Sequence, residues 1–189
     1  MTRVFPFPIL AVSLLIAAPP GATQPPAAGT TASDHQHDFD FEFGAWHTHL
    51  RRLVSPLSGS TAWVELDGLS TVRKVWDGNA NLGEFAASNA ASHIQGLSLR
   101  TFNPATQQWN IYWANRKDGA VTTAPMVGRF DNGRGKFYGN DTFAGKPIRV
   151  RFIFTERTAQ AFQLEQSFSA DAGKTWEANW IADFTLIGA

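Results

Sequence analysis

The pair His47-x-His49 is the arrangement in this sequence closest to a metal-binding motif. Residues two apart on a strand project from the same face, so both imidazoles could reach one ion. A competent site needs a third and usually a fourth ligand, but Arg51, Arg52 and Leu53 stand where a carboxylate would be expected. The two cations also disfavour a divalent metal. We therefore expect no metal and no other cofactor, and we expect both histidines on the outer face of their strand.

Glu165 and Glu177 are the candidate pair for acid–base catalysis, because a hairpin brings them close together. Such catalysis needs carboxylates in contrasting environments. The residue pattern places both on the solvent-facing side, where a pairing with Arg149 or Arg151 on a neighbouring strand is the simpler interpretation; a polar interior would place them inside. The chain has no cysteine and no Gly-x-Ser-x-Gly sequence, so it offers no thiol nucleophile and no nucleophile elbow. Any catalytic residues stay unknown.

The stretch Ser169–Trp176, SADAGKTW, fits the pattern S-x-D-x-G-x-T-W, the Asp-box known from the repeated blades of sialidases. A propeller repeats a blade of about 40 residues at least about four times, whereas this motif occurs once. We interpret it as a single hairpin turn. Asp171 would hydrogen-bond the backbone of its own turn, Gly173 would take the left-handed conformation, and Trp176 would fold back over the turn. The motif predicts no catalysis.

Runs of alternating or β-rich residues follow one another along the chain, and none keeps a helical apolar period. They are residues 45–54, 62–66, 69–76, 83–88, 95–102, 109–115, 125–130, 136–138, 148–155, 161–169 and 175–187. Turn sequences such as Asp67-Gly68 and Asp131-Asn132-Gly133 separate them. Short turns between consecutive strands make an antiparallel meander, and about nine to eleven strands hide their edges by closing. The sequence thus predicts an all-β protein, a single antiparallel up-and-down β-barrel.

The last hairpin predicts which side chains face the barrel interior. The expected inward residues are Phe162, Leu164, Gln166 and Phe168, then Trp176, Ala178, Trp180, Ala182 and Phe184. The expected outward residues are Glu165, Ser167, Glu177, Asn179 and Asp183. A slip by one residue would mix the two classes, and burial would penalise it. The expected interior is therefore lined with Trp, Phe and Leu.

Three polar residues share this inward alternation: Gln166, Asn115 and Arg52. A buried polar side chain without a partner costs about 1–3 kcal/mol. These three therefore pair with each other and the backbone, or they orient a ligand, as a few polar groups do in apolar small-molecule sites. The candidate ligand-binding residues are Trp46, Arg52, Trp113, Asn115, Gln166 and Trp180. Alternatively, Arg52 caps the closed end of the barrel over Trp46.

The N-terminal residues predict export. A positive charge at Arg3 precedes the apolar run ILAVSLLIAA, and small residues follow, which is typical of a signal peptide over residues 1–22. The run is too short for a membrane span, which needs about 20 apolar residues. Residues 23–37 would form a flexible lead and residues 38–189 the barrel domain. We expect a periplasmic or secreted bacterial protein without stable membrane insertion after cleavage. A net charge of +0 with scattered Lys and Arg disfavours nucleic acid as a partner.

Phe43-Gly-Ala-Trp46 resembles the Gly-x-Trp of lipocalin and calycin barrels, in which the Trp plugs the closed end. Trp63-x-Glu65-x-x-Gly68, Asn110-Ile-Tyr-Trp113 and SADAGKTWEANW extend the likeness. Together these motifs resemble a family of uncharacterised exported bacterial proteins, a domain of unknown function with a lipocalin-like barrel. The resemblance runs from about Asp38 to Phe184. It implies the fold and export but no activity.

Two functions of different classes follow from these observations, with a third beside them. The first is an exported barrel that binds a small hydrophobic or aromatic molecule, in keeping with 7 Trp and 15 Phe in the chain. The alternative is a cofactor-free barrel enzyme of the isomerase, cyclase or hydratase type. The third is a filled barrel acting through its surface. A cavity above about 300 Å³ would favour a ligand, and an ionisable residue deep inside it would favour the enzyme. The oligomeric state stays open.

Overall fold

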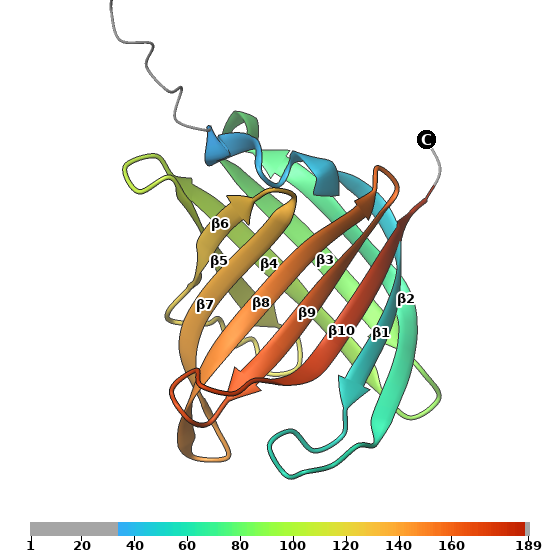
Figure 1. Ribbon diagram of the computed structural model, residues 1–189. Helices are drawn as coiled ribbons and strands as arrows, with labels where there is room; N and C mark the ends of the chain where they lie inside the picture. The colour runs from blue at the N-terminus through green and yellow to red at the C-terminus, as the bar shows by residue number, and fades with distance from the viewer. Residues whose placement is uncertain (1–33, 188–189) are drawn as a thin grey trace, which may run out of the picture. The chain divides into compact units, whose positions relative to one another are not determined.

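The strands close into one antiparallel barrel (Figure 1). The computed structural model describes residues 34–187, except the side chain of Arg157. The strands are β1 (Gly44–Leu53), β2 (Trp63–Val75), β3 (Ala80–Ser88), β4 (His93–Asn103), β5 (Gln108–Asn115), β6 (Met126–Asp131), β7 (Arg134–Phe143), β8 (Lys146–Thr158), β9 (Ala161–Ser169) and β10 (Glu177–Leu186). Each pairs antiparallel with its sequence neighbours, and β1 also pairs with β10. The predicted all-β up-and-down barrel is thus confirmed.

The predicted turn at Asp67-Gly68 is wrong, because β2 runs straight through it. Gly68 pairs with Thr48 on one side and with Ala87 on the other. A Cβ at Gly68 would lie 1.9 Å from the carbonyl oxygen of Ala86. The glycine is therefore there because β3 approaches closely, and not because the chain reverses.

Two short 3-10 helices lie across one end of the barrel (Figure 1). They are η1 (His35–His37) and η2 (Asp40–Glu42), and a third, η3 (Trp76–Gly78), connects β2 to β3. Phe39, between η1 and η2, is completely buried. The N-terminal segment thus closes this end of the barrel with side chains. Within residues 34–187, no helix is long and apolar enough to cross a membrane.

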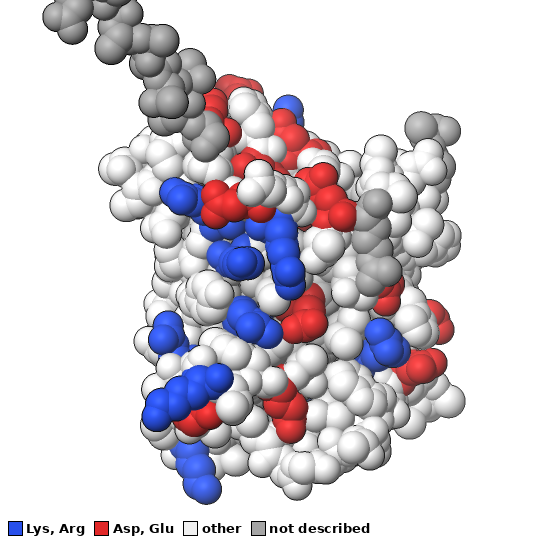
Figure 2. All heavy atoms as spheres, in the orientation of Figure 1, with Lys and Arg blue, Asp and Glu red and all other residues white. Residues whose placement is uncertain are grey.

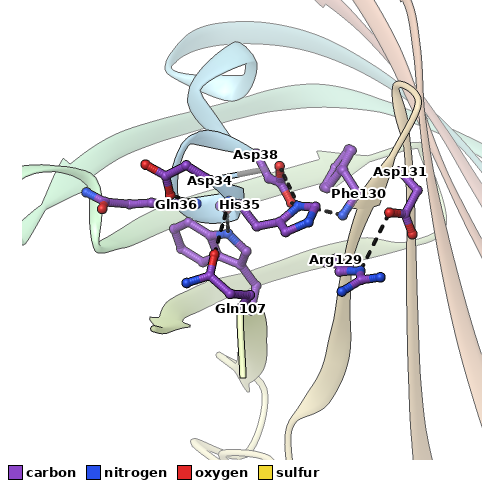
Figure 3. Close-up of polar contacts among 9 residues, drawn as sticks. Asp34, His35, Gln36, Asp38, Gln107, Arg129, Phe130 and Asp131 are labelled. Atoms are coloured by element: carbon purple, nitrogen blue, oxygen red, sulfur yellow. Dashed lines mark hydrogen bonds and ion pairs between the residues drawn. The ribbon is translucent and has the colours of Figure 1, made fainter. Parts of the chain in front are cut away.

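Hydrogen bonds fix the N-terminal segment to the barrel (Figure 3). The indole of Trp109 donates to the carbonyl of His35 at 2.7 Å, and the backbone N–H of Phe130 donates to the Asp38 carboxylate at 2.9 Å. Nδ1 of His35 lies 3.0 Å from that carboxylate. Residues 34–37, predicted to belong to a flexible lead, are instead packed on the barrel. The predicted signal peptide and the rest of the lead lie outside the described residues.

The predicted register of the last hairpin is correct up to a β-bulge in β10. Trp180 pairs with Gln166, and Phe184 pairs with Phe162, all on the inner side. The register then shifts between Ala178 and Trp180. A bulge places an extra residue in one strand and reverses the alternation beyond it. The expected orientation therefore fails at Asn179, in the bulge, and at Trp176, on its far side.

Two side chains near this bulge depart from the prediction. Asn179, expected on the wet face, is buried and accepts a hydrogen bond from the inward Gln166. Trp176, expected inside, lies against the outward Arg151 and Tyr138 instead. The Arg151 guanidinium is 4.7 Å from the centre of the Trp176 ring, within the range of a cation–π contact.

The Asp-box forms the turn that the sequence predicts. The carboxylate of Asp171 accepts hydrogen bonds from the backbone N–H of Thr175 at 2.9 Å and from its hydroxyl at 2.7 Å. Gly173 has a φ of 94°, and the indole of Trp176 donates to the carbonyl of Gly173 at 3.0 Å. Ala172, where a second glycine would be expected, also has a positive φ of 61°. The motif therefore acts as a structural turn on the outer surface.

Charges of both signs mix on the face formed by β7–β10 and β1 (Figure 2). Arg151 of β8 pairs there with Glu165 of β9 at 3.4 Å, as the sequence predicts. Lys and Arg gather over the upper middle of the face that the figure shows, with Asp and Glu beside them.

Removing the Asp171 carboxylate should weaken the fold in a pH-dependent way. Hydrogen bonds from Thr175 and Ser169 hold the pKa of Asp171 well below its usual value of 3.8. The ionised carboxylate therefore stabilises the folded state above that value, and this stabilisation is lost as the pH falls toward the folded-state pKa. We expect Asp171→Ala to lower the Tm at pH 7 and to lower it less at pH 2. Thermal denaturation at both pH values measures this, and an equal loss at both would contradict the assignment.

Candidate ligand-binding site

The barrel is hollow toward the end opposite the 3-10 helices. It encloses a cavity of about 1160 Å³. The lining extends from Glu42 and Arg100 at the closed end to residues 121–124, in the loop between β5 and β6. Large apolar side chains make up much of the wall: Phe85, Ile111, Trp113, Phe152, Leu164 and Trp180. The filled-barrel alternative therefore does not describe this interior.

Small residues on β2, β3 and β4 leave the space for this cavity. Ser70, Gly83 and Ser98 line it from three adjacent strands, opposite the large side chains of β8–β10. Gly96 acts differently, because a Cβ there would lie 2.3 Å from the Trp113 indole. The glycine thus gives Trp113 the room to lie along the wall. The barrel is therefore hollow because several of the side chains that β2, β3 and β4 contribute to its interior are small.

A buried ion pair forms the floor of the cavity. Nη1 of Arg100, on β4, donates a hydrogen bond to Oε2 of Glu42, at the end of η2. Their side chains are 8% and 1% exposed. The guanidinium lies 4.5 Å from the centre of the Phe39 ring, a favourable position for a cation. The N-terminal segment thus delivers both the apolar plug and the carboxylate that compensates the arginine.

The floor has polar atoms that the protein itself does not satisfy. Oε1 of Glu42, Nε of Arg100, Oγ of Ser98 and Nδ2 of Asn81 are buried without a hydrogen-bond partner. Burial raises the pKa of Glu42 above its usual value of 4.5, while the charge and hydrogen bond of Arg100 act in the opposite direction. Glu42 offers an acceptor, Arg100 a donor and Ser98 a hydroxyl. All three residues belong to the cavity lining.

Five of the six predicted site residues line the cavity. They are Arg52, Trp113, Asn115, Gln166 and Trp180. Trp46 does not: it is 2% exposed, it packs edge-on against Phe162, and its indole donates to the carbonyl of Glu42 at 2.8 Å. It belongs to the closed end, beneath the floor of the cavity.

Arg52 does not cap Trp46, so that alternative is wrong. The two residues lie toward opposite ends of β1, and Arg52 is exposed. Arg100 takes the place at the closed end that was predicted for Arg52. Its guanidinium packs on Phe39 and binds the Glu42 carboxylate. The backbone carbonyl of Glu42 in turn accepts a hydrogen bond from the Trp46 indole. Arg52 instead contributes a positive charge at the open end of the cavity.

Gln166 and Asn115 both have protein partners. Nε2 of Gln166 donates to Oδ1 of Asn179 at 2.8 Å. Oδ1 of Asn115 accepts from the backbone N–H of Lys117 at 2.9 Å, in the turn that follows β5. No hydrogen bond among the described residues joins Gln166, Asn115 and Arg52 to each other. The pairing within the protein favours a structural role for Gln166, with its side chain still forming part of the wall.

The other candidates for chemistry lie outside the cavity. Glu165 pairs with Arg151 on the outer surface, and Glu177 accepts a hydrogen bond from the backbone N–H of Leu57 at 2.6 Å. His47 is exposed, and Nδ1 of His49 lies 2.8 Å from Asp67. Over residues 34–187, no three His, Asp or Glu side chains are grouped so that they could hold a metal ion.

Glu42 and Arg100 were not predicted from the sequence as site residues. In β4 the leucines Leu97 and Leu99 are 41% and 42% exposed, while Ser98 and Arg100 face inward. Apolar alternation therefore predicts the wrong face for this strand. The available signal was the row of small residues on the other face, including Gly96, because a glycine within a strand often marks a close approach.

Comparison with known proteins supports the fold without assigning a family. No family model matches the chain, and no curated protein matches it. Among solved structures, the S-type phycobiliprotein lyase CPES from Guillardia theta is similar, with a TM-score of 0.56 and 9% sequence identity. The match covers 80% of this chain and 91% of that chain. It shows a lipocalin-like barrel fold. The resemblance to a family of uncharacterised exported bacterial proteins stays a prediction.

The Glu42–Arg100 pair should show strong coupling in a double-mutant cycle. Removing one partner leaves the other charge buried alone, which costs about 3–5 kcal/mol, whereas replacing both with apolar side chains is often neutral. We expect Glu42→Leu and Arg100→Met each to lose that much free energy of unfolding, and the double variant to lose less than either. Urea denaturation measures the cycle. Losses that simply add would show that the pair does not act as a unit.

Gln166→Leu should destabilise the protein. Asn179 is 2% exposed, and the substitution removes the donor to its side-chain oxygen. We expect a loss of about 1–3 kcal/mol in the free energy of unfolding, the usual cost of an unpaired buried polar group. Gln163→Leu is the matched control, because Gln163 belongs to the same strand but donates to Asp183, which is only partly buried. A Gln166→Leu variant as stable as the unmodified protein would favour a role reserved for a ligand.

Proposed function

We propose that this protein is an exported barrel that binds a small hydrophobic or aromatic molecule in its interior. The observation that carries the proposal is the cavity of about 1160 Å³ in the open part of the barrel. Small-molecule sites typically enclose about 300–1,000 Å³, with apolar walls and a few placed polar groups. This cavity is somewhat larger than that range, and its lining is of that kind.

The aromatic side chains of the wall favour a ligand with flat apolar surface. Phe85 lies at the centre of this group, with its ring 5.7 Å from that of Trp180 and 6.2 Å from that of Trp113. A planar molecule could stack on such rings, in the offset or edge-on geometries that aromatic pairs prefer. Each Å² of apolar surface that leaves water contributes about 25 cal/mol to binding. The cavity wall thus supports affinity for an aromatic body without a charged contact.

A cofactor-free enzyme is the second candidate function, and Glu42 favours it. An ionisable carboxyl at the floor of a cavity, with a pKa raised by burial, is a common feature of catalytic sites. The similar barrel of CPES is a lyase, which agrees with the idea that such a barrel can support chemistry. Against catalysis, Arg100 already occupies one carboxylate oxygen of Glu42. Binding therefore stays the first proposal.

A bulky residue built into the cavity should weaken binding without unfolding the barrel. Gly83 lines the cavity, and a Cβ there would meet nothing nearer than 3.6 Å. We expect Gly83→Trp to weaken the binding of the neutral dye N-phenyl-1-naphthylamine about tenfold, equal to about 1.4 kcal/mol. Dye fluorescence measures the affinity, and circular dichroism confirms folding.

The control for this test is Ser88→Trp, which adds the same side chain on the exposed side of β3. It should leave dye binding unchanged. If Gly83→Trp bound the dye as tightly as Ser88→Trp does, the dye would bind outside the barrel, and this would count against the proposal. Native mass spectrometry of protein purified from its own source would then show whether a small molecule accompanies the chain.

Export is part of the proposal and has its own test. The apolar run followed by small residues in residues 1–22 supports a cleaved signal peptide. We expect the full chain, expressed in a Gram-negative bacterium, to be recovered from the periplasm in a shortened form, and a chain lacking residues 1–22 to stay in the cytoplasm and fold. Cell fractionation and intact mass measure both outcomes. Recovery of the full-length chain in the cytoplasm would count against export.

A further inference from the structure

We propose that the floor of the cavity binds a head group of the ligand, and that this head group is neutral and carries both a hydrogen-bond donor and an acceptor, as a carboxamide does. The inference deepens the proposed function and rests on it. It concerns the three cavity-lining residues Glu42, Ser98 and Arg100.

These residues have polar atoms without partners. Oε1 of Glu42, Oγ of Ser98 and Nε of Arg100 make no hydrogen bond within the described protein, although all three atoms are buried. Such a group costs about 1–3 kcal/mol when it stays unpaired. Native structures contain only a few such groups. Partners that enter from the cavity would remove this cost.

The charges at the floor already balance. Arg100 is already compensated by Glu42, because its guanidinium donates to the carboxylate. An ionised carboxylate on the ligand would add an uncompensated negative charge at a site where both side chains are almost wholly buried. An ammonium group would add an uncompensated positive charge. Both are costly in a medium of low dielectric constant, so the ion pair selects for a neutral head group.

The unpaired atoms of the floor include both hydrogen-bond donors and acceptors. An ionised Glu42 only accepts hydrogen bonds, Nε of Arg100 only donates, and the hydroxyl of Ser98 can do either. A primary carboxamide has an NH₂ and a carbonyl on one carbon and can serve both. An ether or a ketone lacks the donor. The apolar body of the same molecule would then extend from the floor along Phe85 and Trp180 toward the open end.

Three naphthalenes of matched shape test this inference at pH 7: naphthalene-2-carboxamide, 2-isopropylnaphthalene and naphthalene-2-carboxylate. Their apolar bodies are identical, and only the head group changes. Quenching of tryptophan fluorescence and isothermal titration calorimetry measure each affinity for the full barrel. We expect the carboxamide to bind at least about tenfold more tightly than either of the other two, a difference of about 1.4 kcal/mol.

Two variants locate the preference at the floor. In Glu42→Leu/Arg100→Met the carboxamide should lose its advantage over 2-isopropylnaphthalene, while the hydrocarbon still binds. Ser98→Ala is a milder second variant that keeps the ion pair, and it should reduce the advantage about threefold, near the lower end of what one hydrogen bond contributes. Phe168→Leu, which alters the cavity wall on β9, is the control. It should weaken all three compounds alike.

The outcomes separate the inference from the proposed function. If the hydrocarbon and the carboxamide bind equally well, the floor holds only water and the inference is overturned, while the binding function stands. If the carboxylate binds most tightly, the floor recognises charge and the inference is also overturned. If none of the three compounds and no dye binds, the proposed function itself fails.

Discussion

The packing of Phe39 at the centre of the closed end is the contact on which the rest of the barrel depends. Its side chain is completely buried, with ring centres of Trp109, Phe130 and Phe154 at 5.1, 5.1 and 5.3 Å. Nearly perpendicular rings at such distances are a favourable arrangement of aromatic side chains. Because this cluster fills one end, the remaining volume is confined to the other. A barrel of this size therefore has one floor and one mouth.

The same segment that carries Phe39 also determines the chemistry of the floor. Glu42 stands at the end of η2 and reaches Arg100, whose guanidinium in turn packs on the Phe39 ring. The plug, the ion pair and the polar face of the cavity are thus consequences of one short stretch of chain. A change that loosened this segment would expose Arg100 as an unpaired charge as well as open the end of the barrel. This linkage explains why an apolar plug carries a carboxylate.

Alternation along single strands was sufficient to predict the fold from the sequence. Whether a side chain points inward or outward is a local property, and β9 and β10 follow the alternation as far as the bulge in β10, so the hairpin and the inward Gln166 were predicted correctly. The Asp-box turn was predictable for the same reason, because Asp171 and Gly173 act within their own turn. The prediction failed where the alternation is interrupted. A two-residue alternation cannot predict the bulge at Asn179 or the 3-10 helix that turns Glu42 inward.

The hollow interior could not be predicted, because it depends on the sizes of residues that meet only across the barrel. Small residues such as Gly83 and Ser98 leave the space that Phe152 and Trp180 on the far wall do not fill. A similar limit applies to the polar residues. Gln166 and Glu42 are both polar residues of the cavity lining, yet Gln166 has a partner in Asn179, whereas one oxygen of Glu42 has none. Residue type and spacing cannot distinguish these two cases. The number of hydrogen-bond partners in the structure does distinguish them. It indicates that a ligand would find free hydrogen-bonding groups at the floor of the cavity, where Glu42 lies, and not at the wall near Gln166.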